Sequence, residues 1–163
     1  MATRLIEAPS VPRATRRVAD PPTRPGRPAS LGFRASAIIA ALLSIAVVVI
    51  HVKDQGGLLT MRDPTYLGIG YFLLEGAGIA AAAVLLSRLA LRSWAWLLAL
   101  GVAAGPFFGF LLSRGPGLPS AMDDRGNWTE PLGLMSAVVE GILMLLAVAA
   151  FVRTRSGAAV RQS

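Results

Sequence analysis

Four long apolar runs, separated by short charged segments, constrain this chain more than any other feature of its sequence. They cover residues 35–52, 66–86, 94–112 and 132–152. Each has close to the ~20 residues that an α-helix needs to cross ~30 Å of hydrocarbon. Because backbone groups in lipid must be hydrogen-bonded within their own segment, each run should be helical. The sequence therefore predicts an all-α membrane protein with four transmembrane helices.

The distribution of charge predicts how these helices are oriented. Residues 1–34 hold seven arginines against two carboxylates, and the short second loop and the carboxyl-terminal segment are also positive. The first and third loops are neutral or negative. Positive segments stay on the cytoplasmic side. We therefore expect a multi-pass protein of the plasma membrane with both termini in the cytoplasm.

Aromatic residues near the ends of the runs agree with this orientation. Trp94 and Trp96 begin the third run, where we expect the inner interface, and Tyr66 and Trp128 lie near the outer one. Tryptophan and tyrosine gather at both membrane–water interfaces. The sequence thus predicts that all four rings belong to aromatic belts.

The segments outside the runs are expected to carry no folded domain. Residues 1–34 are rich in arginine and proline and have no apolar periodicity, so we predict a disordered cytoplasmic tail. The membrane domain covers residues 35–152, and residues 153–163 form a second cytoplasmic tail. The basic charge lies outside the apolar runs, which indicates contact with the lipid bilayer and no nucleic-acid partner.

The second and fourth runs resemble each other. Residues 67–76 (LGIGYFLLEG) align without gaps on residues 132–141 (LGLMSAVVEG), with leucine, glycine, glutamate and glycine identical at four positions. This internal repeat predicts a four-helix bundle made of two hairpins of the same topology. The alternative is that leucine, glycine and valine simply recur in membrane helices.

Two glutamates at equivalent repeat positions are the strongest candidates for a functional site. Glu75 and Glu140 should lie close to the centre of the bilayer, where charge is costly and side chains face a bundle interior or a cavity. Tyr71 and Ser136 each precede a glutamate by four residues, on the same helix face. We expect each hydroxyl to bond its neighbouring carboxyl group.

The third run supplies backbone features that could complete a pocket. Gly101, Gly105 and Gly109 recur at a spacing of four, which favours close helix packing, and Pro106 should kink the helix. Glutamates, hydroxyls and freed backbone would then line one polar pocket that binds a ligand or a proton. The same glutamates could instead bond neighbouring helices and hold the bundle in register, and the sequence leaves both interpretations open.

Several chemistries find no support in the sequence. There is no cysteine and one histidine, His51, and the loop carboxylates Asp123, Asp124 and Glu130 lack the spacing of metal ligands. No phosphate-binding loop or nucleophile–base motif occurs. We therefore expect no metal, no cofactor and no enzymatic activity.

Two outer segments resemble a group of small, uncharacterised four-helix membrane proteins of high-GC Gram-positive bacteria. One is residues 51–57 (HVKDQGG), and the other comprises residues 117–119 (GLP), 126–134 (GNWTEPLGL) and 138–141 (VVEG). The resemblance covers about residues 35–152. It implies the same four-helix topology, and no activity is established for the group.

These observations lead to two hypotheses about function, besides a membrane enzyme that acts on lipid, for which the sequence holds no motif. The first is that the protein binds or passes a small solute, an ion or a proton at the buried glutamate pair, as a homo-oligomer. The alternative is a structural or accessory subunit of a larger membrane complex, with the glycine face of the third run as the surface that docks its partner.

Overall fold

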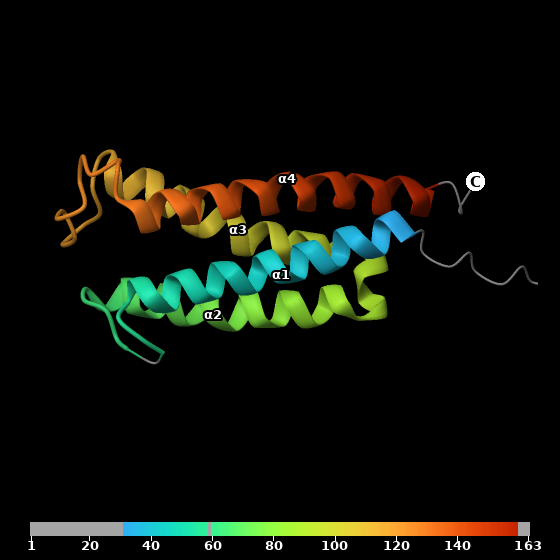
Figure 1. Cartoon of the computed structure of the whole chain (residues 1–163), viewed down its shortest axis with the longest axis horizontal. Helices are drawn as coiled ribbons and strands as arrows, with labels where there is room; N and C mark the ends of the chain where they lie inside the picture. The colour runs from blue at the N-terminus through green and yellow to red at the C-terminus, as the bar shows by residue number, and fades with distance from the viewer. Residues whose placement is uncertain (1–30, 59, 160–163) are drawn as a thin grey trace, which may run out of the picture.

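The computed structural model describes residues 31–58 and 60–159 of this chain. These residues form four long α-helices and one short 3-10 helix (Figure 1). The elements are α1 (Leu31–Asp54), α2 (Thr65–Leu86), η1 (Arg88–Leu91), α3 (Ser93–Arg114) and α4 (Pro131–Ala159). Each of the four α-helices is long and apolar enough to cross a membrane. The predicted all-helical fold class is confirmed at this level.

All four helices extend beyond the predicted apolar runs, α1 and α4 by the most. α1 begins at Leu31, inside the predicted tail and three residues after Pro28, the last proline before the helix. α4 continues past Val152 to Ala159, and its 29 residues span ~43 Å, more than the hydrocarbon of a bilayer. The backbone hydrogen bonds of a helix do not require apolar side chains, so a helix can continue past the end of an apolar run. The remaining parts of the two predicted tails, residues 1–30 and 160–163, lie outside the described residues.

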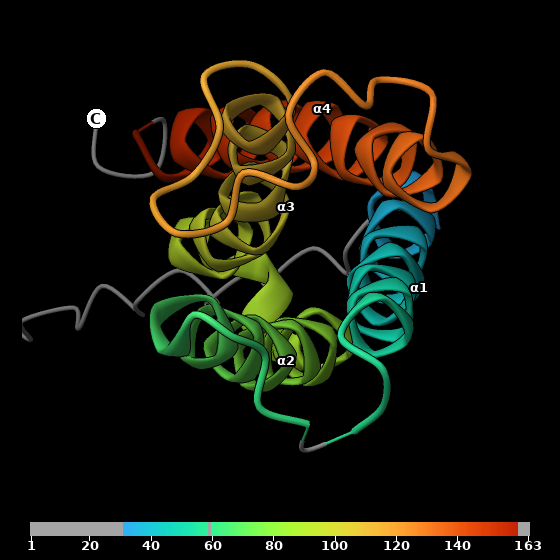
Figure 2. The same cartoon turned by 90° about the vertical axis from the view of Figure 1, so that its left-hand side faces the viewer.

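The four helices form a ring around a common interior (Figure 2). α1 packs mainly against α2 and α4, α3 packs mainly against α4, and α2 and α4 lie on opposite sides of the ring. The connections that follow α1 and α3 lie at one end of the molecule, which we call the loop end (Figure 1). The connection through η1 lies at the other, the η1 end.

Small side chains make up most of the interior between α1 and α2. A Cβ placed on Gly78 would run into the side chain of Val48 and come within 3.3 Å of the Ser44 carbonyl oxygen. Ser44 is fully buried, and its hydroxyl donates to the carbonyl of Ala40 at 2.8 Å. Small residues at a helix interface allow the backbones to approach closely. Gly78 therefore determines how near α2 can lie to α1.

Trp96 packs in the core and does not belong to an aromatic belt, contrary to the prediction. It is 0% exposed, and its indole N–H donates to the carbonyl of Ala90 at 2.8 Å. The ring of Phe33 packs edge-on against it, with centroids 5.7 Å apart. Trp94 is 47% exposed, as a belt residue requires. Two residues along a helix turn the side chain by ~200°, so one tryptophan faces out and the other in.

Candidate functional site

A cavity of about 710 Å³ lies among the four helices and extends into the loop between α3 and α4. Asp63, Ser120 and Asp123 line it and are exposed to solvent, so its mouth is at the loop end. From there it runs along α3 as far as Leu97. Its volume is within the ~300–1,000 Å³ of typical small-molecule sites.

Glu140 and Ser136 form a polar centre inside this cavity. Both are on α4 and both line the cavity. The Ser136 hydroxyl donates to Glu140 Oε1 at 2.5 Å, as the spacing of four residues predicts. Glu140 is fully buried, and its second oxygen, Oε2, has no hydrogen-bond partner among the described residues. A buried carboxylate oxygen without a donor is costly, so this atom needs a donor that the described residues do not supply.

His51 comes from α1 and lies beside Glu140. Its Nδ1 is 2.9 Å from the carbonyl oxygen of Val47. Because a carbonyl oxygen only accepts, Nδ1 must carry the proton, and Nε2 of the neutral ring is then an acceptor. Nε2 lies 3.7 Å from Glu140 Oε1, too far for a direct hydrogen bond.

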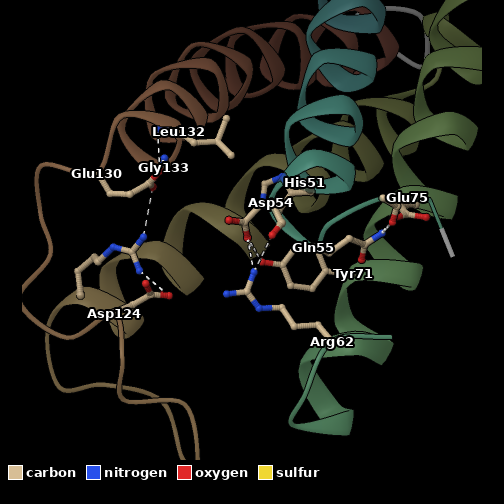
Figure 3. Close-up of polar contacts among 12 residues, drawn as sticks. His51, Asp54, Gln55, Arg62, Tyr71, Glu75, Asp124, Glu130, Leu132 and Gly133 are labelled. Atoms are coloured by element: carbon tan, nitrogen blue, oxygen red, sulfur yellow. Dashed lines mark hydrogen bonds and ion pairs between the residues drawn. The ribbon is translucent and has the colours of Figure 1, made fainter. Parts of the chain in front are cut away.

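A first cluster of charged residues lies at the loop end of α1, close to α2 (Figure 3). Arg62 donates from Nη1 to Asp54 Oδ2 at 3.0 Å, and the Tyr71 hydroxyl donates to the same carboxylate oxygen. The guanidinium of Arg62 also lies 5.8 Å from the centroid of the Tyr71 ring. Asp54, Arg62 and Tyr71 all line the cavity. The cluster joins the end of α1 to α2 and the connection between them.

A second cluster surrounds Arg114, at the end of α3. This buried arginine pairs with Asp124 at 2.8 Å and with Glu130 at 3.4 Å (Figure 3). Glu130 also accepts from the backbone N–H groups of Leu132 and Gly133, at 2.9 and 2.6 Å. These are two of the N–H groups that the first turn of α4 leaves unpaired, and a negative charge is favourable at this end of a helix. Arg114 thereby connects α3, the loop and α4 at the cavity mouth.

Glu75 takes no part in lining the cavity. It is 6% exposed and accepts a hydrogen bond from the side-chain amide of Gln55, which also donates to the Gly57 carbonyl at 3.0 Å. Tyr71, expected to bond Glu75, donates to Asp54 instead. In Figure 3 the first cluster lies between Asp124 on one side and Glu75 with Gln55 on the other. The structure therefore brings Tyr71, Ser136 and Glu140 to one cavity but directs Glu75 elsewhere.

The glycines of α3 form a wall of the cavity. A Cβ added to Gly101, Gly105 or Gly109 would meet nothing within 4 Å, so the described residues do not pack closely against these glycines, contrary to the prediction. These glycines and Pro106, which lies inside α3, all line the cavity. Their missing side chains create open space.

Neither His51 nor Gln55 is among the site residues that the sequence predicts. A signal for His51 was available, since it is the one histidine of the chain and it ends an apolar run. No such signal exists for Gln55, which bonds a residue 20 positions away. Within residues 31–58 and 60–159, no three histidine, aspartate or glutamate side chains lie together in a way that could hold a metal ion.

Comparison of the chain with protein-family models, curated proteins and solved structures found no match. Its function must therefore be argued from the geometry of the cavity.

Proposed function

We propose that this chain is a multi-pass plasma-membrane protein that binds a small solute in the cavity between its helices. In this proposal both termini are cytoplasmic and the loop end faces outward. The four apolar helices and the alternation of basic and acidic segments support that orientation. The solute would enter from the outer side, past Asp63 and Asp123.

The observation that carries the proposal is a cavity lined by Glu140, a buried carboxyl group whose second oxygen has no hydrogen-bond partner among the described residues. The cavity joins exposed charged residues at the mouth to Glu140 inside the bundle. Ligand sites commonly combine an apolar wall with a few convergent polar groups. The η1 end, in contrast, is filled by a packed core that includes Leu85, Trp96 and Leu143. Because the cavity is closed at that end, binding is favoured over passage through the protein.

In this proposal the two glutamates of the internal repeat have different roles. Both repeat glutamates are buried and accept a hydrogen bond, which supports two related hairpins. Glu140 lines the cavity, whereas Glu75 accepts a hydrogen bond from Gln55, in the connection after α1. We therefore assign binding to Glu140 and a structural role to Glu75.

Single cysteines can test whether the cavity is open to water, since the chain has no cysteine of its own. We expect Gly105→Cys to react with a membrane-impermeant methanethiosulfonate reagent added from outside. Gly105 lines the cavity about as deep as Glu140 and has open space beside it. Labelling in whole cells is measured by the mass shift of the purified protein.

Gly76→Cys is the matched control for this experiment. Gly76 also has open space beside it and lies at a similar depth on α2, but it is exposed on the outside of the bundle and not in the cavity. A thiol that faces lipid stays protonated and unreactive. Failure of Gly105→Cys to react, or equal reaction of both variants, would contradict a water-accessible cavity.

A further inference from the structure

We propose that the ligand of this cavity carries a primary ammonium group, which donates N–H bonds to Glu140 and His51 while its apolar chain lies along the glycines of α3. The inference rests on the proposed function and specifies the chemical class of the solute. Three independent features of the cavity support it: the hydrogen-bond roles at its polar centre, the charge of its lining and the apolar space beside Glu140.

The polar centre presents more acceptors than donors, since the Ser136 hydroxyl is bonded to only one of the Glu140 oxygens. Glu140 Oε2 has no donor among the described residues, and Nε2 of the neutral His51 ring is an acceptor because Nδ1 donates to Val47. The terminal torsion of a glutamate side chain is soft, so either carboxylate oxygen can turn toward the cavity. Nε2 and Oε1 are 3.7 Å apart, so one nitrogen with several N–H groups can reach both side chains. An ammonium group has three such donors.

The lining charge also favours a cation. Six carboxyl side chains line the cavity, from Asp54, Asp63, Asp123, Asp124, Glu130 and Glu140. The lining holds two arginines, Arg62 and Arg114, and both are already paired with carboxylates at the mouth. A cleft lined by one sign of charge and walled by apolar groups concentrates ions of the opposite sign. Cations should therefore be enriched in the cavity and anions repelled.

Apolar space beside and beyond Glu140 can hold the rest of the ligand. The cavity continues past the level of Gly105 to Ala77 and Leu97, where its lining is apolar. Gly70, Leu73, Leu97 and Gly101 line the cavity and are also exposed, so it opens sideways between α2 and α3. A chain attached to the ammonium group can lie in this space, or leave through the side opening into the bilayer.

Two sources can supply a primary ammonium group here. One is a soluble alkylamine that enters from the mouth. The other is the ammonium headgroup of a membrane lipid that enters between α2 and α3. Their shared chemistry is the N–H⁺ donor, and the lipid composition of the test membrane separates them.

The test is calorimetric titration of the protein in phosphatidylcholine nanodiscs, with empty nanodiscs as the blank. Butylammonium should bind. Tetramethylammonium, which has the charge but no N–H donor, and butanol, which is of similar length but uncharged, should bind at least about tenfold more weakly, since hydrogen bonds to charged groups contribute most of the selectivity. Competition by added phosphatidylethanolamine would identify the lipid headgroup as the ligand, and unchanged butylammonium affinity would identify a soluble amine. Either result supports the ammonium site.

The variants Glu140→Gln and Glu75→Gln form a matched pair. Both replace a buried glutamate by its neutral isostere at equivalent repeat positions, but only Glu140 lines the cavity. Glu140→Gln should weaken butylammonium binding at least about tenfold, and Glu75→Gln should leave it unchanged. Because Ser136 can still donate to the glutamine carbonyl, Glu140→Gln should fold.

Two results would overturn the inference: equal affinity for butylammonium and tetramethylammonium, or equal loss of binding in both glutamine variants. Neither depends on Gly105→Cys labelling. If Gly105→Cys reacts but butylammonium does not bind, the water-accessible cavity is supported and its ligand is of another chemical class. If Gly105→Cys does not react, the proposed function itself fails.

Discussion

Replacement of Trp96 by alanine should lower the free energy of unfolding by about 3 kcal/mol, the low end of the range for large aromatic residues in protein cores. Trp96 is fully buried, packs against Phe33 and bonds the Ala90 carbonyl of η1. Alanine would leave a cavity and a buried carbonyl oxygen without its donor. The low end applies because the alternative environment in a membrane is lipid, which solvates apolar groups well. Unfolding in mixed detergent–SDS micelles, followed by circular dichroism, measures the change.

Trp94→Ala is the matched control for this prediction. Trp94 lies two residues away on α3 and is half exposed, so its loss should change stability by no more than about 0.5 kcal/mol. Trp96→Phe should fall between the two, because it keeps most of the packing and removes the hydrogen bond to Ala90. Similar losses for Trp94→Ala and Trp96→Ala would show that Trp96 is not the anchor of the η1 end.

Gly78→Leu should destabilise the protein by about 1–3 kcal/mol, as overpacking of a close interface does. A Cβ alone would already collide with Val48 and approach the Ser44 carbonyl oxygen, which belongs to the backbone and cannot rotate away. The larger side chain must push α2 away from α1. The same micelle unfolding experiment measures the loss.

Gly76→Leu provides the comparison on the same helix. The space beside Gly76 is open, and leucine is a better helix former than glycine by roughly 0.5–1 kcal/mol. This variant should therefore gain a little stability while Gly78→Leu loses it. The prediction for Gly78 is wrong if both variants shift stability in the same direction.

Much of the architecture was predictable because it follows from local rules. An apolar run of about 20 residues has to satisfy its own backbone hydrogen bonds, so the four helices follow directly from hydropathy. The bond from Ser136 to Glu140 lies within one helix face, and a spacing of four residues was enough to predict it. Such contacts depend on residues that are neighbours in the sequence.

The candidate site was only partly predictable, because it depends on how the helices are rotated about their axes. Tyr71 has the same spacing from Glu75 as Ser136 has from Glu140, but its longer side chain reaches Asp54, on α1. Glu75 meets Gln55 instead, from the connection after α1. A repeat in the sequence does not place the same partner opposite each copy.

The sequence by itself determined the number and approximate positions of the helices, and that two carboxyl groups lie among their apolar residues. The tertiary structure alone decided that Glu140 lines a cavity and Glu75 does not, that His51 lies beside Glu140, and that the glycines of α3 border empty space. The physical reason is that helical periodicity specifies which residues share a face, whereas side-chain packing decides which neighbour that face meets.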